Sequence, residues 1–304
     1  MNTKLKELNL VYRKLKLSDY QKFKKLFYSC FKKKITYNFF KWRYFDDKHS
    51  FCYGVFESSK LIANVGMKAM ELNYKKNKTI YSRHSSMVLA NYRGIGIFSE
   101  LLKKVKKKIL NKFPIVVMWP NKNNFSNFGI KKSKILKKKY YLYKIQNFKK
   151  KRKITINYNL NQLNKFKFFF KNTESFFYKD LNYFKKRYLY YKKNEYLINV
   201  FKLKNLKSFF ILKKNIDKKG LNYVILEHFG SKQISKEHFK NLVNENKETV
   251  FWTNNKINKP NYILIDSINL NIGLIKNFSF KEKKLILSKK NFMIGDTDSF
   301  ITIE

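Results

Sequence analysis

A glycine-bearing turn between a strand-like run and an amphipathic helix constrains this chain more than any other feature. The turn is Tyr92-Arg93-Gly94-Ile95-Gly96-Ile97-Phe98, and the run before it is Thr79–Leu89. A tight turn at the start of a helix directs several free backbone N–H groups to one point, at the positive end of the helix dipole. The sequence therefore predicts an anion-binding loop, and the pyrophosphate of a nucleotide cofactor is the ligand that suits it best.

The segments after this turn predict a βαβ crossover. Apolar residues recur at helical spacing through residues 98–109, and lysines fill the remaining positions of that helix. The short apolar run Ile115–Trp119 then has the character of a buried strand. A strand, a loop, a helix and a strand of these sizes form a crossover that joins two parallel strands.

The segments before the turn predict a strand, two helices and an antiparallel meander. The expected elements are a strand over Leu10–Lys16, a helix from Ser18, a helix over Tyr37–Tyr44, and strands over Phe51–Glu57, Leu61–Met70 and Thr79–Leu89. A last strand of this half is expected over Tyr140–Phe148. The predicted fold class is α+β, with a mixed, mostly antiparallel sheet flanked by helices.

The length of 304 residues is compatible with two domains. The basic run Phe148–Lys153 follows the last strand of the first half, so we expect one domain over residues 1–150 and another over 151–304. The second half is predicted to be α+β as well, and its element order partly echoes the first. A degenerate second copy is therefore a hypothesis, although nothing like the Arg93–Ser99 loop recurs.

The net charge of +48 has two interpretations. Lysines interleaved with aromatic residues indicate a nucleic-acid or anionic-surface partner. Drift toward Lys, Asn, Ile, Phe and Tyr, whose codons are AT-rich, gives the same total. Only six of the 68 basic residues are Arg, the residue that sequence-specific binders use for bidentate contacts, so drift is favoured and nucleic acid is not the expected partner.

Other features concern the compartment and metals. Cys30 and Cys52 lack metal-type spacing, and neither a signal peptide nor a membrane-spanning run is recognised, so a cytoplasmic protein is expected. Gly295–Asp298 resembles an Asp-x-Asp metal motif, but no cluster of carboxylates accompanies it, which favours a polar turn and no metal. Glu227-His228 ends a predicted strand and is interpreted as a structural pair.

The segment Asn91–Leu101 resembles the acyl-CoA loop of the GCN5-related N-acetyltransferases. That pattern is Gln or Arg, two residues, Gly, one residue, then Gly or Ala. Arg93 and Gly96 match it, and Phe98 stands where the last small residue is usual. The turn Pro120–Phe125 after the buried run resembles the Asn-bearing turn of the same family, and the resemblance covers roughly Val11 to Phe148.

This resemblance implies a cosubstrate, acetyl-CoA, whose pantetheine arm lies between two splayed strands. Main-chain N–H groups of the loop would hold the pyrophosphate, and main-chain groups of the preceding strand would bond to the pantetheine amides. The cofactor-binding residues that the family pattern implies are Met87, Val88, Leu89, Arg93, Gly94, Ile95, Gly96, Ile97, Phe98, Ser99, Asn121 and Asn124.

Acyl transfer to an amine calls for a base that keeps the amine neutral. His84 is the first candidate, because it lies on the strand that precedes the loop and has a suitable pKa; a structural histidine is the alternative. Glu71 and Glu57 are rival bases near strand ends.

The acid that protonates the leaving thiolate is less well defined. Phe125 and Phe128 stand where the family often has a tyrosine, and neither can donate a proton. Tyr140 is therefore the candidate, with Tyr141 and Tyr143 as alternatives on the same predicted strand.

The resemblance predicts an N-acyltransferase that acts on a small-molecule amine, with a sugar-linked amine of surface glycan synthesis suggested by analogy and the second lobe shaping the acceptor site. One alternative is a lysine-rich module that binds nucleic acid or makes peripheral contact with an anionic surface. The other is a family member that binds its cofactor without turnover.

Overall fold

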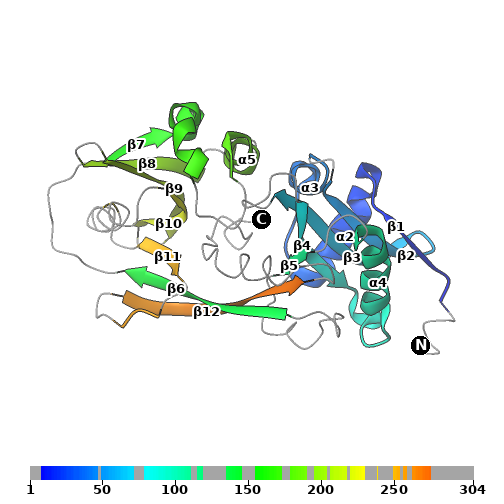
Figure 1. The fold of residues 1–304 in the computed structure, drawn as a ribbon. Coiled ribbons are helices and arrows are strands. Elements are labelled where there is room, and N and C mark those ends of the chain that lie inside the picture. The colour runs from blue at the N-terminus through cyan, green and yellow to red at the C-terminus, as the bar shows by residue number, and fades with distance from the viewer. Residues whose placement is uncertain are drawn as a thin grey trace. The chain divides into compact units, whose positions relative to one another are not determined.

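A computed structural model describes most of the chain, in two compact units (Figure 1). The described residues are 8–46, 49–71, 79–110, 115–118, 135–145, 155–172, 179–189, 195–203, 206–217, 220–229, 238, 249–253, 256–258 and 262–274. The first unit comprises Met1–Lys137, Leu270–Lys284 and Ile301–Glu304, and the second comprises Lys138–Asn269 and Leu285–Phe300. No described helix is long and apolar enough to cross a bilayer.

The first unit follows the predicted element order. Its elements are β1 (Leu10–Lys14), the 3-10 helix η1 (Leu17–Asp19), α2 (Tyr20–Phe31), α3 (Tyr37–Tyr44), β2 (Phe51–Glu57), β3 (Lys60–Glu71), β4 (Thr79–Val88), η2 (Ala90–Tyr92), α4 (Ile97–Leu110) and β5 (Ile115–Met118). Strands β1 to β4 pair antiparallel in sequence order, and β4 pairs parallel with β5. The predicted α+β class, the meander and the parallel crossover are confirmed.

Helix α4 covers one face of this sheet. Its buried residues Ile97, Leu101 and Val105 pack in one cluster with Val65 and Met67 of β3. Apolar positions at helical spacing on α4 meet apolar positions at every second residue on the strand, which is the match that a helix packed on a sheet requires.

Helices α2 and α3 cover the opposite face. Gly66 lies between Val65 and Met67 and therefore faces the other side of β3, where a Cβ would lie 2.6 Å from Cε1 of Tyr44 in α3. Ring contacts of Phe23 with Phe40 and Tyr44 place α2 beside α3. Phe23 and Tyr44 are fully buried, so this aromatic layer forms a second core.

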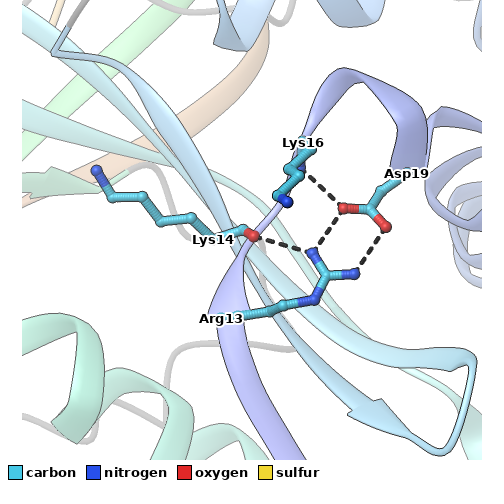
Figure 2. A network of polar contacts seen from close by, with 4 residues as sticks. All are labelled: Arg13, Lys14, Lys16 and Asp19. Atoms are coloured by element: carbon cyan, nitrogen blue, oxygen red, sulfur yellow. Dashed lines mark hydrogen bonds and ion pairs between the residues drawn. The ribbon is translucent and has the colours of Figure 1, made fainter.

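An ion pair closes the connection from β1 to α2 (Figure 2). The two terminal nitrogens of Arg13 donate to the carboxylate of Asp19 at 2.7 and 2.8 Å, and the N–H of Lys16 donates to the same carboxylate at 2.8 Å. The hydrogen bond from Arg13 is the main reason that the pKa of Asp19 lies below its usual value. Asp19 is 4% exposed, so this carboxylate depends on its protein partners rather than on water.

The second unit is also built mainly of strands. Its elements are β6 (Ile135–Ile145), which begins in the first unit, β7 (Thr155–Asn159), the 3-10 helix η4 (Leu160–Asn172), α5 (Leu181–Phe184), the π-helix η5 (Lys185–Leu189), β8 (Tyr196–Leu203), β9 (Leu206–Asp217), β10 (Gly220–Phe229), β11 (Thr249–Thr253) and β12 (Tyr262–Leu274), which ends in the first unit. Strands β7 to β10 pair antiparallel in order, and β10 pairs parallel with β11. Strand β11 pairs antiparallel with β6.

The strands of the two units pair in the same order. In each unit a strand precedes helical turns, three further strands complete an antiparallel meander, and the fourth strand pairs parallel with the next strand. In each unit one more strand then pairs antiparallel with the fifth strand. This strand is β12, beside β5, in the first unit and β6, beside β11, in the second. This common order supports the hypothesis of a degenerate repeat.

The last strands of the two units differ from the expected arrangement. The segment expected as the last strand of the first half, Tyr140–Phe148, overlaps β6, which pairs with β11 of the second unit. Residues Asn271–Leu274 of β12 pair with β5 instead. Each unit thus uses a strand that sequence order alone would assign to the other.

Replacing Asp19 tests the ion pair at the start of α2. We expect Asp19→Asn to lower the free energy of unfolding by about 2 kcal/mol at pH 7, because charge-assisted hydrogen bonds are lost. The unfolded carboxyl binds protons at a higher pH than the folded one, so the contribution of Asp19 is complete above about pH 4 and is lost as the pH falls further. Urea unfolding at pH 7 and pH 3 measures both effects.

The matched control is Asp46→Asn, because Asp46 is exposed. If Asp19→Asn and Asp46→Asn change stability equally at pH 7, the ion pair does not contribute as proposed.

Candidate functional site

The predicted anion-binding loop joins β4 to α4. Its backbone turns through η2, and two glycines then adopt positive φ, Gly94 at 81° and Gly96 at 94°. Side chains other than glycine rarely adopt these angles, so both positions depend on glycine for their conformation. A Cβ at either glycine would meet nothing within 4 Å, which shows that space lies open beside the loop.

The start of α4 carries amide groups ahead of the first helical bond. The N–H of Glu100 donates to the carbonyl of Gly96 at 3.1 Å. The N–H groups of Ile97, Phe98 and Ser99 therefore belong to the first turn, where a helix offers no acceptor of its own. Together with open space beside Gly96, these groups fit an anion such as a pyrophosphate.

Arg93 lies at the entrance of the loop, as expected, and bonds back to β4. Its Nε donates to the carbonyl of Val88 at 3.0 Å. The thiol of Cys30, near the end of α2, donates to the same carbonyl at 3.5 Å. Burial raises the pKa of Cys30, so the neutral thiol is the form present at neutral pH. These contacts tie α2, β4 and the loop together at one point.

The main chain of Leu89 is already bonded within the protein. Its N–H donates to the carbonyl of Ile62 at 2.9 Å, and its carbonyl accepts from the N–H of Tyr92 at 3.0 Å. Of the three residues expected to bind pantetheine, Leu89 thus has both main-chain groups engaged, and the carbonyl of Val88 is engaged by Arg93. The hydroxyl of Tyr92 donates to Glu57, and this bond raises the pKa of Tyr92. Glu57, a rival base in the sequence, thus anchors the loop.

Strand β4 is bulged shortly before the loop. Met87 pairs with Asn64 and His84 pairs with Gly66, so Ser85 and Ser86 together stand opposite one residue of β3. Ser85 adopts a φ of 46°. The parallel pairing with β5 is described from Tyr81 to Arg83, and the bulge follows it directly. The strand thus changes course between its paired part and the loop.

The structure places His84 at this bulge. His84 is half-buried, and it pairs with Gly66, so its side chain lies on the face covered by α3. Glu71 pairs with Thr79, five residues from His84 along β4, which separates the two candidate bases by about 17 Å. Of these two candidate bases, His84 is thus the nearer to the loop.

The candidate acid Tyr140 lies on β6, in the second unit. Its alternative Tyr143 is buried there and accepts a hydrogen bond from the N–H of Ile257 at 2.7 Å. Asn121, Asn124 and Asp296 lie outside the described residues, as do the side chains of Glu71 and Tyr140.

Glu227 has a structural role, as the sequence indicates. Its carboxylate pairs with the fully buried Lys179 at 2.6 Å and accepts from the hydroxyl of Tyr188 at 2.8 Å. In the described part of the chain, no three His, Cys, Asp or Glu side chains gather in a way that could hold a metal ion.

Two features of the site, Arg83 and the bulge, were not predicted from the sequence. Arg83 lies where the pairing with β5 ends, with its guanidinium carbon 5.8 Å from the ring centre of Phe98, and burial lowers its pKa to about 10. The bulge at Ser85-Ser86 was the second. Its only sequence signal is the polar pair itself, which interrupts the alternation of the strand.

Comparisons with known proteins agree with this arrangement. Residues 11–130 match the family described as acetyltransferase (GNAT) domain. No curated protein sequence matches the chain significantly. The matched residues contain β1 to β5, the bulge and the glycine loop, which are the elements that build the site.

Solved structures share the fold over most of the chain. A GCN5-related N-acetyltransferase from Anabaena variabilis superposes with a TM-score of 0.68 at 9% identity, covering 88% of this chain and 73% of its own. A probable N-acyltransferase from Enterococcus faecalis has a TM-score of 0.67 at 11% identity, with the same coverages of 88% and 73%. The glucosamine N-acetyltransferase region of a fungal β-N-acetylglucosaminidase has a TM-score of 0.60 at 10% identity and covers 87% of this chain and 38% of that one. The site at β4 and α4 therefore lies within the part of the chain that matches the acetyltransferase (GNAT) domain family, and the chain shares its fold with solved GCN5-related N-acetyltransferases.

Proposed function

We propose that this chain is an N-acyltransferase that moves an acetyl group from acetyl-CoA to a small-molecule amine. The observation that carries the proposal is the loop from Arg93 to Ser99, in which two positive-φ glycines precede the free amides of α4. The family match over residues 11–130 supports acyl transfer as the reaction class. Acetyl-CoA is the cosubstrate that such a loop suits best.

The residues proposed to hold acetyl-CoA are those that the family pattern implies, and the geometry of the loop supports part of this set. The N–H groups from Ile95 to Ser99 would bond to the pyrophosphate, and the main chain of Met87 and Val88 would bond to the pantetheine amides. Arg93 holds the carbonyl of Val88 and would fix the course of this segment. Asn121 or Asn124 would approach the thiol end, as the family pattern implies.

The reaction requires a neutral amine, stabilisation of the thioester oxygen and departure of the thiolate. We assign the base to His84, directly or through a water molecule, because it lies at the bulge beside the proposed thioester position. A main-chain N–H at the bulge would stabilise the developing charge on oxygen. Glu71 and Tyr140 remain weaker proposals for base and acid, since one lies about 17 Å along the strand and the other in the second unit.

The acceptor is proposed to be an amine on a sugar or another small molecule. The fold shared with a glucosamine N-acetyltransferase region makes amino sugars the first class to test. We propose that the first unit binds acyl-CoA and that the second selects the acceptor. A reducing, cytoplasmic setting fits the free thiols of Cys30 and Cys52.

Gly96→Ala tests the loop. Alanine is strained at a φ of 94°, so the amides of the first turn of α4 should move, and the added methyl would occupy the open side of the loop. We expect at least a tenfold loss of acetyl-CoA affinity in calorimetry, with the fold retained. The control is Ser58→Ala in the turn between β2 and β3, and equal affinities for the two variants would contradict the assignment.

Turnover tests the reaction itself. Thiol release from acetyl-CoA, measured against a panel of amino sugars and amino acids, should rise with at least one amine. His84→Gln should lower kcat by at least tenfold and remove the acidic limb of the pH–rate profile, because a positioned base is lost. His49→Gln is the control, since His49 is exposed.

Full turnover by His84→Gln would exclude His84 as the base. Tight binding of acetyl-CoA with no release of thiol against any amine would instead favour a binding protein that has lost catalysis.

A second candidate function, binding of single-stranded nucleic acid, is favoured by one exposed patch. Tyr28, Phe31 and Tyr37 are 52%, 42% and 43% exposed around the end of α2, and the exposed residues 32–34 between them are lysines. Exposed rings can stack on bases while lysines contact phosphates. Among the described residues, this patch is the surface that suits single-stranded nucleic acid best.

Salt dependence distinguishes the two functions. If the patch binds nucleic acid, the affinity for a single-stranded oligonucleotide should fall more than tenfold between about 50 and 200 mM salt, whereas acetyl-CoA affinity should change much less. Replacing Lys32, Lys33 and Lys34 with Gln should lower the affinity for the oligonucleotide. The same replacement of Lys103, Lys106 and Lys107 should leave this affinity unchanged. Oligonucleotide binding that is weak at low salt, or equal for both triple variants, excludes the patch.

A further inference from the structure

The bulge of β4 is held from outside the strand. Ser85 has a φ of 46°, a conformation that costs free energy for any residue with a Cβ and persists only where the surroundings hold it. The hydroxyl of Tyr44, at the end of α3, hydrogen-bonds to the hydroxyl of Ser85. The side-chain N–H of Asn64, on β3, donates to the carbonyl of Ser85 at 3.1 Å.

Both partners of Ser85 are deeply buried. Tyr44 and Asn64 are each 0% exposed, so neither can exchange its bond to Ser85 for one to water. Gly66 makes room for the tyrosine, since a Cβ there would lie 2.6 Å from Cε1 of Tyr44. A helix and a neighbouring strand thus fix the same residue from two directions.

In the second unit, a tyrosine hydroxyl likewise contacts the strand that corresponds to β4. Strand β10 occupies the position of β4 in the shared topology, and its pairing with β9 shifts register between Ile225 and Glu227. The hydroxyl of Tyr188, from the helical segment before β8, donates to Glu227 at 2.8 Å. Tyr44 and Ser85 are 41 residues apart, and Tyr188 and Glu227 are 39 apart.

The two bulges differ in what accompanies them. Glu227 is fully buried and paired with Lys179, so its carboxylate has no contact with solvent. Ser85 is half-buried, beside the half-buried His84 and the end of the described pairing with β5. The tyrosine contact is common to both units, while an accessible bulge is found in the unit that carries the glycine loop.

We propose that Tyr44 and Asn64 are positioning residues for acyl transfer. Through their bonds to Ser85 they fix the point at which β4 departs from its pairing, and so they place His84 on one side of the bulge and the main chain of Met87 and Val88 on the other. Neither residue touches the reacting atoms. The proposal rests on the proposed acyltransferase function of the first unit.

Tyr44→Phe tests this role with a minimal change, because only the hydroxyl is removed. We expect kcat to fall at least tenfold while acetyl-CoA affinity changes less than threefold, since the amides from Ile95 to Ser99 are untouched. Hydrogen exchange in the free protein should accelerate at least tenfold over residues 84–88 and stay unchanged over 79–83. Tyr20→Phe is the matched control, because the hydroxyl of Tyr20, at the start of α2, donates to the carbonyl of Ile35 at 2.8 Å, in the connection between α2 and α3.

A double-mutant cycle separates this coupling from general destabilisation. Ser85→Ala removes the partner of Tyr44, so the double variant Tyr44→Phe with Ser85→Ala should be no slower than the slower single variant. Independent, multiplying losses would overturn the proposed coupling. Asn64→Leu, which removes the second contact, should raise exchange over the same residues 84–88.

The outcomes separate this proposal from the proposed function. If Tyr44→Phe matches Tyr20→Phe in both kcat and exchange, the positioning role is overturned. If the wild-type chain transfers no acetyl group, the proposed function fails, but hydrogen exchange in the free protein still decides whether Tyr44 holds the bulge. Unchanged exchange over residues 84–88 in Tyr44→Phe overturns this role of Tyr44, and faster exchange supports it.

Discussion

The proposed binding of a pyrophosphate depends on free main-chain amides at the start of α4. They are free because a helix leaves its first N–H groups without acceptors, and they are accessible because Gly94 and Gly96 take positive φ beside open space. The lysines that dominate the composition do not create this site. A pyrophosphate would be held by backbone geometry, whose strength depends little on which basic residues surround it.

The shared topology of the two units gives this site its context. Each unit builds a meander, a bulged fourth strand and a parallel fifth strand, and a tyrosine from the preceding helical segment reaches the bulged strand. The second unit fills the corresponding position with the buried Lys179–Glu227 pair. A buried ion pair of this kind leaves no room for a thioester at that position, so the acyl-transfer site is proposed for the first unit.

The sequence predicted much of the fold because its signals are local. Alternation along Leu61–Met70, helical periodicity after Gly96 and the apolar run before Trp119 led directly to β3, α4 and β5. The exchange of β6 and β12 between the units was not predicted, because antiparallel partners far apart in sequence leave no local pattern. The bulge was missed for a related reason: Tyr44, Asn64 and Ser85 meet only in the folded unit. The place of His84 on the strand before the loop was predicted correctly because strand and loop adjoin in the sequence, and its role as base stays a prediction.

A crystal structure of the chain with coenzyme A tests directly whether the main-chain amides at the start of α4 hold the pyrophosphate. We predict that the pyrophosphate oxygens lie within hydrogen-bonding distance of the N–H groups from Ile95 to Ser99, with the pantetheine arm along Met87 and Val88. Coenzyme A bound at the lysine-rich end of α2, or a loop that stays empty at saturating ligand, would contradict it.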